Sequence, residues 1–458
     1  MSASLELLTN SEPLRKILDP FFFNGKKSAP PTWPEIEAIA AKHLHERIGP
    51  LRCTNHVWYV QQNGVWNPTD HNVYRPLALE VLPDAWRTEA RSSNVMKRLE
   101  AEQQVTRDQF CGAAKFDADG NVLVAVQNGT LLITPNELDL LPTDPAQGFT
   151  AALPVAWEPE ATAPLFFTTI RELLPDPADP EILLDVVATA LIPDCRFEAA
   201  LVCLGSGGTG KSTIFVPIVT LLGPRACSTL NLKEICNPNG YFLSQLNHKL
   251  LNLATELNSL EMEDSGIFKQ LVSGEPFMTR DIYGAPFEMR STATLIFLAN
   301  NLPRFKHGTT AEVRRLRFVC FNHTIEKPDI TLKDRLPAEA PGVFAELVRR
   351  AQELLGGRRI SQAGTFGQET SERFAISNDP VSAFVQSCCQ VGQDLECDKD
   401  LLCKAFDAFR ESNGISEKFD KATFLTGLYN RFSGVKPYRK RCGQTRLNLV
   451  QGIELLPS

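Results

Sequence analysis

The nonapeptide GSGGTGKST, residues 205–213, lies near the middle of this chain. Its outer glycines stand five positions apart and are followed at once by a lysine and a serine, a spacing that lets backbone N–H groups wrap around a phosphate chain. In such a loop Lys211 reaches the β and γ phosphates as a point charge, and the hydroxyl of Ser212 binds Mg²⁺. The stretch therefore predicts a nucleotide phosphate site with bound Mg²⁺. Its predicted residues are Gly205, Ser206, Gly207, Gly208, Thr209, Gly210, Lys211, Ser212 and Thr213.

The residues on either side of this loop favour a strand before it and a helix after it. Residues 199–205, AALVCLG, are a short apolar run typical of a buried parallel strand. Residues 211–223, KSTIFVPIVTLLG, predict an apolar helix that ends at Gly223 and whose N-terminal dipole points at the phosphates. Pro217 removes one N–H in the second turn, so we expect a kink there that costs about 3 kcal/mol.

Composition predicts an ordinary globular protein. The chain has 458 residues, 43% hydrophobic and 8% aromatic, with a formal net charge of -7. This length predicts roughly two to four domains. The longest apolar stretch, residues 182–192, is too short to span a bilayer and contains Asp185. We therefore expect no membrane segment, no signal peptide and a cytoplasmic location. In so acidic a chain, any nucleic-acid contact must come from local basic patches.

The cysteines and histidines form no regular metal-binding pattern. Twelve cysteines occur without a CxxC pair, and we interpret them as reduced, mostly buried thiols. The segment 43–56 holds three histidines and one cysteine, yet it lacks the spacing of a zinc knuckle. We expect packing or surface roles for these side chains.

Residues 1–170 are predicted to form a mixed α/β domain rich in hairpins. Asn63-Gly64 lies between alternating apolar residues in 57–66, and residues 116–133 contain two more turns of this kind. Prolines then gather in residues 140–167, which we interpret as an extended linker.

Two acids in this domain have the spacing of metal ligands in a primase or polymerase. Asp117 and Asp119 lie in the run DADGN, which is also ordinary turn chemistry. The next histidine along the chain is His248, beyond the phosphate loop, so the other nucleotide-binding groups of such a polymerase are missing. We therefore expect a turn here and no intact primase site.

Beyond the loop, two apolar strands end in polar residues. Residues 248–257, HKLLNLATEL, carry Glu256, and a carboxylate at a strand tip can polarise the attacking water and bind Mg²⁺. Residues 291–305, STATLIFLANNLPRF, end their apolar run at Asn300, whose amide can hydrogen-bond the γ phosphate or the water. We predict Glu256 as the hydrolytic base and as a metal-side residue beside Ser212.

Basic side chains follow in a hairpin and an arginine pair. Residues 268–289, FKQLVSGEPFMTRDIYGAPFEM, predict a hairpin that turns near Tyr283 and has Lys269 and Arg280 available. Arg314 and Arg315 precede another apolar run, and a guanidinium stabilises the charge of a transferring phosphoryl group. Between residues 269 and 321 eight Lys and Arg stand against four Asp and Glu. Basic charge is therefore concentrated in this segment.

In this order the blocks resemble the superfamily 3 helicases, specifically the phage and plasmid primase family with its poxvirus-type primase-helicase relatives. That family shows GPGGNGKST, a strand ending in a lone Glu, KxLxxGEPxxxRxxYxxPFxF, AxNxLPxF and RRL before an apolar run. The chain has GSGGTGKST, LLNLATE, FKQLVSGEPFMTRDIYGAPFEM, LIFLANNLPRF and RRLRFVCF. The resemblance covers about residues 120–325, and NGTLLI at 128–133 is similar to a recurring piece of the domain that precedes the helicase.

The resemblance implies an α/β fold with an AAA+ type P-loop core at 171–355, which binds ATP and Mg²⁺ between the subunits of a hexameric ring. The ring would drive single-stranded DNA through its pore with the hairpins, in the replication of a phage, plasmid or other mobile element. The implied catalytic residues are Lys211, Glu256, Asn300, Arg314 and Arg315, one of the arginines acting in trans. Thr255 stands where many relatives have a second acid. A separate primase or polymerase is a possible partner.

The tail, residues 356–458, is predicted to be a winged-helix DNA-binding domain, which the resemblance also implies. Two helical runs precede a basic two-stranded segment, and from 431 to 453 six Lys and Arg occur without an acid. This patch predicts a contact with duplex DNA. The predicted DNA-binding residues are Lys269, Arg280, Tyr283, Lys436, Arg439, Lys440, Arg441 and Arg446.

Two other functions are compatible with the phosphate loop. A DNA-dependent ATPase that binds an origin or loads another helicase would share every block named above. A small-molecule kinase would share only the loop, and it would leave the arginine pair and the basic tail without a role.

Overall fold

The computed structural model describes residues 32–82, 86–237, 242–257, 261–262, 265–281, 284–305, 310–323, 329–415, 419–442 and 445–456. Contacts divide the chain into two compact units, Met1–Trp157 and Glu158–Ser458. The unit boundary falls inside residues 140–167, where the prolines predict an extended linker. Across the described residues, no helix combines the length and apolar character needed to cross a membrane.

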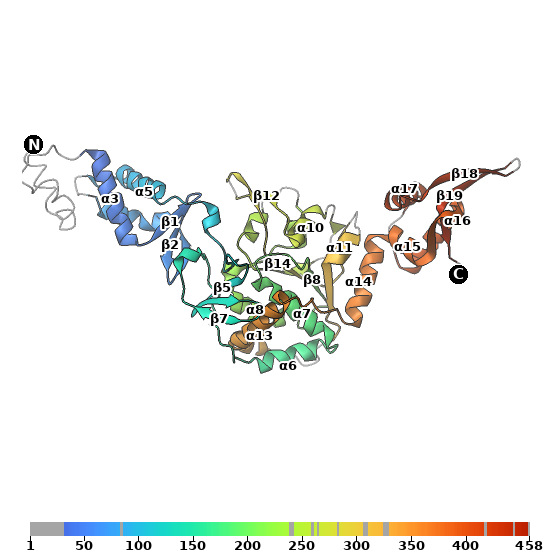
Figure 1. Cartoon of the computed structure of the whole chain (residues 1–458), viewed down its shortest axis with the longest axis horizontal. Coiled ribbons are helices and arrows are strands. Elements are labelled where there is room, and N and C mark those ends of the chain that lie inside the picture. The colour runs from blue at the N-terminus through green and yellow to red at the C-terminus, as the bar shows by residue number, and fades with distance from the viewer. Residues whose placement is uncertain are drawn as a thin grey trace, which may run out of the picture. The chain divides into compact units, whose positions relative to one another are not determined.

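The first unit begins with helices packed on a small antiparallel sheet (Figure 1). The strands β1 (Leu51–Thr54), β2 (Val57–Gln62) and β3 (Val65–Thr69) lie in that order, and the helices are α3 (Trp33–Ile48), α4 (Arg75–Glu80) and α5 (Glu89–Glu102). Buried side chains from both layers, Leu44, Trp58 and Leu99 among them, form one core. The hairpin between β2 and β3 turns at Asn63-Gly64, where φ is 51° and 81°, so the predicted turn is confirmed.

A second antiparallel sheet completes this unit. Its order is β4 (Ala114–Phe116), β5 (Val122–Val126), β6 (Gly129–Ile133) and β7 (Leu138–Leu141). A carboxylate oxygen of Asp117 accepts the backbone N–H groups of Asp119, at 2.9 Å, and Asn121, at 2.8 Å. Asp117 is therefore a turn former between β4 and β5, as the sequence predicts.

The second unit is built on a parallel sheet, and the predicted α/β class is confirmed. Its described strands lie in the order β16-β8-β14-β10-β9, and every pairing is parallel. The strands are β8 (Ala200–Leu204), β9 (Cys227–Ser228), β10 (Leu251–Leu257), β14 (Thr294–Ala299) and β16 (Leu316–Cys320). The carboxyl ends of these strands therefore lie at one edge of the sheet. The phosphate loop begins at this edge, directly after β8.

Helices surround this sheet (Figure 1). They are α6 (Pro164–Leu173), α7 (Ala178–Ala188), α8 (Lys211–Ala226), α9 (Leu232–Ile235), α10 (Gly266–Ser273), α11 (Thr310–Arg315), α12 (Leu332–Arg335), α13 (Ala340–Leu355) and α14 (Thr365–Asn378). Small strand pairs also occur, β11 (Glu261–Met262) with β15 (Arg304–Phe305) and β12 (Phe277–Arg280) with β13 (Pro286–Met289).

The helix after the phosphate loop departs from helical backbone angles at Gly223. Within α8, Pro217 keeps helical backbone angles, and only Gly223 departs from them, with φ 73° and ψ 166°. The predicted helix end at Gly223 is confirmed, and the kink expected at Pro217 stays a prediction. A buried proline in the second turn has a helix-compatible φ and removes one hydrogen bond, which the packing of Pro217 tolerates.

A buried acid ties three segments of this unit together. The Asp185 carboxylate on α7 is fully buried and accepts hydrogen bonds from Arg350 on α13 at 2.8 Å, from Arg358 at 2.6 Å and from the Ser361 hydroxyl at 2.7 Å. Burial alone would raise its pKa, and the hydrogen bonds from Arg358, Ser361 and Arg350 outweigh that effect, so the pKa lies below its usual value.

Replacing Asp185 with alanine is expected to lower the free energy of unfolding by about 3–5 kcal/mol, because two guanidinium groups then lose their buried partner. The pKa of Asp185 is lower in the folded than in the unfolded chain, so the ionised carboxylate stabilises the fold at pH values above the unfolded pKa. This contribution to the free energy of unfolding is lost as the pH falls through the folded pKa. The difference between wild type and variant should therefore shrink in acid. Urea unfolding at several pH values measures it, with Asp400→Ala, which breaks the exposed ion pair with Lys421, as the control. A loss equal to that of the control would contradict this role.

The C-terminal residues have a core of their own. Its elements are α15 (Pro380–Cys388), β17 (Cys389–Asp398), α16 (Lys399–Ser412), α17 (Lys421–Arg431), β18 (Lys436–Cys442) and β19 (Thr445–Leu455), with an antiparallel sheet in the order β17-β19-β18. This core runs from Val381 to Ile453, whereas Phe374 of α14 packs in the core of the parallel sheet. The two helices and the hairpin predicted for the tail are present, and α15 and β17 join them.

Candidate nucleotide and DNA sites

The phosphate loop connects β8 to α8 in the conformation that its glycines permit. Gly208 and Gly210 have φ values of 80° and 79°, in the left-handed region that favours glycine. A Cβ at Gly205 would lie 2.6 Å from the carbonyl oxygen of Phe321, and one at Gly210 would lie 2.7 Å from Leu173. These glycines therefore allow the loop to curl tightly at the carboxyl edge of the sheet.

Lys211 begins α8 and points back into the loop. Its ammonium group donates to the carbonyl oxygens of Gly205 at 2.5 Å and Ser206 at 2.7 Å, and it lies 3.4 Å from the Oδ1 atom of Asn300. Partial burial lowers the pKa of Lys211. The structure thus brings Lys211 and Asn300 together, although 89 residues separate them in the sequence.

The strand that carries Glu256, β10, lies next to β14, which Asn300 follows. β10 pairs with β14 until Ala254, and the register then shifts before Leu257 pairs with Ala299. The backbone of Glu256 lies in this bulge, and bulges re-aim side chains next to active sites. The side chain of Glu256 lies outside the described residues, so its role as hydrolytic base stays a prediction.

A cavity of about 870 Å³ opens over these residues. This volume lies within the range of small-ligand sites. Its lining includes residues 207–213 of the phosphate loop, together with Thr255 and Asn300. The residues fit a nucleoside triphosphate with Mg²⁺, because curled backbone N–H groups, a lysine and a serine hydroxyl face one cavity.

Two walls of this cavity carry residues that the sequence motifs do not include. Thr169, Glu172 and Leu173 come from α6, and His323, Asp329, Ile330, Leu332 and Lys333 come from the segment after β16. These residues follow no motif spacing. They line the cavity because α6 and the chain after β16 both lie at this edge of the sheet. Ile330, at 87% exposure, stands at the rim and offers an apolar surface.

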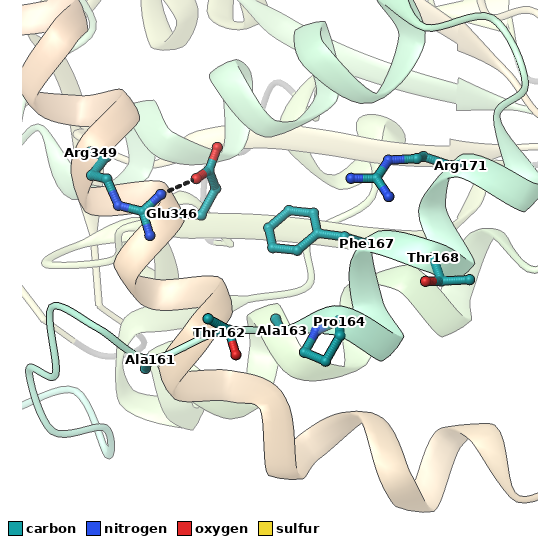
Figure 2. Close-up of a pocket in the computed structure, with 10 residues that line it drawn as sticks. Ala161, Thr162, Ala163, Pro164, Phe167, Thr168, Arg171, Glu346 and Arg349 are labelled. Carbon is teal, nitrogen blue, oxygen red and sulfur yellow. Dashed lines mark hydrogen bonds and ion pairs between the residues drawn. The ribbon is translucent and has the colours of Figure 1, made fainter.

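A second cavity of about 370 Å³ lies between α6 and α13. Figure 2 shows Phe167 projecting between the two helices, with Arg171 and Arg349 on either side. Arg349 donates to Glu346 at 2.6 Å, which neutralises part of the positive charge. The residues that line this cavity include no glycine loop that could curl around phosphate, so the larger cavity is the candidate nucleotide site.

The predicted arginine pair lies at the opposite edge of the sheet from the phosphate loop. Leu316, which follows Arg315, pairs with Ala200 at the beginning of β8, whereas the loop follows the end of β8. The five residues of β8 separate the two edges by roughly 16 Å. The structure therefore does not bring the arginines and Lys211 of one copy together.

The two arginines have different surroundings. The Arg315 guanidinium donates to the hydroxyl of Ser273 at 2.8 Å and lies 3.2 Å from the Glu198 carboxylate, with only 13% of its side chain exposed. Arg314 is exposed. Arg314 is therefore the better placed of the two to reach another molecule.

The predicted hairpin is present as β12 and β13, with Arg280 paired across from Pro286. Arg280 is exposed beside Met278, whose exposure is 62%. Tyr283 lies outside the described residues. Lys269 lies on α10 rather than on the hairpin, 3.3 Å from the buried carboxylate of Glu312, so this ammonium already has an acidic partner.

The basic tail forms an extended hairpin. β17 pairs with β19 only as far as Leu449, and beyond it β18 and β19 pair with each other alone, which Figure 1 shows as a projecting arm. Arg439 and Lys440 are exposed on this arm, and Lys436 is exposed in the three-stranded part of the sheet. The Lys440 ammonium lies 3.0 Å from Glu396. The side chains of the two remaining predicted contacts, Arg441 and Arg446, lie outside the described residues.

Comparisons with known proteins give two family matches. Residues 41–175 match the family described as "D5 N terminal like", and residues 203–315 match a family of unknown function, DUF5906. The second match begins in β8 and ends at Arg315, so it spans the phosphate loop, Asn300 and both arginines. No curated protein matches this sequence.

Solved structures share the fold. An A form apo structure of the NrS-1 C-terminal region is similar with a TM-score of 0.52 and 10% sequence identity, over 90% of this chain and 98% of that chain. Another apo structure of the same region gives a TM-score of 0.50 with the same identity and coverage. At this identity the likeness concerns the fold alone.

Proposed function

We propose that this chain is an ATP-dependent DNA helicase of superfamily 3 that works in the replication of a phage, plasmid or other mobile element. The observation that carries the proposal is the carboxyl edge of the parallel sheet, where Lys211 lies beside Asn300 in a cavity of about 870 Å³. The match to the D5 N-terminal-like family supports a place among phage primase-helicase proteins.

The chemistry follows from what each residue can donate or accept. The loop N–H groups and Lys211 bind the phosphates, and the Asn300 amide orients the γ phosphate or the attacking water. Glu256 accepts a proton from that water. Ser212 and Glu256 would hold Mg²⁺, which when bound neutralises charge on the β and γ phosphates.

The position of the arginines favours catalysis between copies of the chain. Arg314 lies roughly 16 Å of strand length from the loop of its own copy, so the phosphates it can reach belong to a neighbour. A guanidinium supplied in trans stabilises the transferring phosphoryl group. A head-to-tail contact that repeats this interface closes into a ring, and we propose a hexamer.

The exposed β12–β13 hairpin and the β18–β19 arm are the two proposed DNA contacts. Arg280 on the hairpin would track the backbone of single-stranded DNA in the pore of the ring. The arm, with an exposed Arg439, would bind duplex DNA as the wing of a winged helix. ATP hydrolysis would then move the single strand relative to the ring.

Unwinding of a labelled forked DNA duplex with ATP, measured beside ATP hydrolysis on the same DNA, tests this function. A helicase separates the strands in proportion to the ATP it hydrolyses. DNA-dependent hydrolysis without strand separation would contradict the proposal and favour an initiator or a helicase loader.

Replacing Arg439, Lys440 and Arg441 together with alanine is expected to weaken duplex binding about equally for all sequences. Each lost phosphate contact should flatten the dependence of log affinity on log salt by about 0.9. Titrations of labelled duplex at several salt concentrations measure both effects. The control replaces the exposed Lys42 and Lys97 of the first unit. Equal slopes for wild type and the triple variant would exclude the arm as a DNA contact.

A further inference from the structure

A buried acid connects α10, the helix that precedes the β12–β13 hairpin, to α11, the helix that carries Arg314 and Arg315. Glu312 on α11 is fully buried, and one of its carboxylate oxygens accepts the hydroxyl of Ser265, the residue before α10. The same oxygen lies 3.3 Å from the ammonium of Lys269 on α10. A buried carboxylate requires such partners, so the beginning of α10 and the middle of α11 are held together.

A second tie joins the other end of α10 to the same helix. Arg315, the last residue of α11, donates from two guanidinium nitrogens to the hydroxyl of Ser273, at 3.0 and 2.8 Å. Ser273 is the last residue of α10. After it, Gly274 caps the helix in a left-handed conformation, and β12 begins at Phe277. The base of the β12–β13 hairpin is therefore fixed to α11.

Both helices have little freedom between these ties. α10 has eight residues, which span about 12 Å, and its apolar side chains Phe268, Leu271 and Val272 are buried in the core of the sheet. α11 continues into β16 without an intervening loop. Arg314 stands between the two tied positions of α11, so a displacement of α10 must displace Arg314 as well.

We propose that Glu312 and Ser273 are positioning residues that couple the hairpin to Arg314. Single-stranded DNA bound on the β12–β13 hairpin shifts α10, and the two ties pass that shift to α11 and its arginine. This inference rests on the proposed function, since it needs DNA on the hairpin and a nucleotide of a neighbouring copy within reach of Arg314. It adds the path by which DNA stimulates hydrolysis.

The test uses the full chain with two variants, Glu312→Gln and Ser273→Ala. Rates of ATP hydrolysis are measured without DNA and with an oligothymidylate single strand. Each variant should keep the basal rate and reduce the stimulation by DNA at least about fivefold, the lower end of typical couplings between sites. Glu372→Gln and Ser412→Ala, which change exposed residues on α14 and α16, are the matched controls and should be stimulated as wild type is.

A binding experiment separates coupling from loss of structure. The affinity for labelled oligothymidylate is measured with and without a non-hydrolysable ATP analogue. If the two contacts carry the coupling, any effect of the nucleotide on DNA affinity should shrink in the same variants, while the DNA affinity without nucleotide stays the same. Ser273→Ala removes only a partly exposed hydroxyl, so it keeps the test valid if the buried Glu312→Gln change unfolds the protein.

The two possible failures differ. If DNA stimulates wild type and both variants equally, α10 does not carry the coupling, and the proposed helicase stands. If wild type neither hydrolyses ATP nor responds to DNA, the proposed function and the coupling are overturned together.

Discussion

Replacing Arg314 with alanine is expected to lower kcat for ATP hydrolysis by about 10³-fold or more while leaving the affinity for ATP unchanged. Arg314 is exposed at the amino edge of the sheet, roughly 16 Å of strand length from the phosphate loop of its own copy. We therefore expect its guanidinium to stabilise a transferring phosphoryl group in another copy and not to contact the nucleotide of its own copy.

Steady-state hydrolysis and binding of a fluorescent ATP analogue separate these effects. Arg359→Ala, which removes another exposed guanidinium, is the matched control. Arg315→Ala should also reduce the rate, but with a loss of thermal stability, because it breaks the contacts with Ser273 and Glu198. A wild-type rate for Arg314→Ala would contradict its role.

Replacing Glu256 with glutamine is expected to retain ATP binding and to lower kcat at least about 10²-fold, because an amide cannot accept the proton of the attacking water. Lys211→Ala should instead abolish ATP binding, because it removes the positive charge aimed into the loop. Only the glutamine variant leaves the phosphate loop intact.

The same two assays check this pair of variants. Glu369→Gln, at an exposed position of α14, is the control for the loss of one carboxylate. If Glu256→Gln hydrolyses ATP at the wild-type rate, Glu256 is not the base, and another group at the cavity must activate the water.

Local sequence signals predicted most of the elements that build the site. Glycine spacing and apolar runs gave β8, the loop and the start of α8, because those residues specify their backbone without distant partners. The Asn63-Gly64 turn follows from the same local chemistry. Local signals do not predict β17, because its segment, CQVGQDLECD, has a glycine and acids in place of a strong apolar alternation.

The arrangement of the site in space needed the structure. No spacing rule shows that Asn300 lies 3.4 Å from Lys211, because their proximity depends on the pairing of β8 with β14. The pairing of Lys269 with Glu312, 43 residues later, was likewise hidden in the sequence. The amino-edge position of Arg314 is a third case, since it follows from the register of β16 against β8.

Mixing two inactive proteins tests whether the catalytic site is shared between copies of the chain. The Lys211→Ala protein keeps Arg314 but lacks the lysine of the phosphate loop. The Arg314→Ala protein keeps this lysine but lacks the arginine. In rings assembled at random from equal amounts, about a quarter of the interfaces carry both intact groups, so the mixture should recover up to about a quarter of the wild-type rate. A mixture as inactive as its two components, under conditions where both enter the same rings, would contradict the shared site.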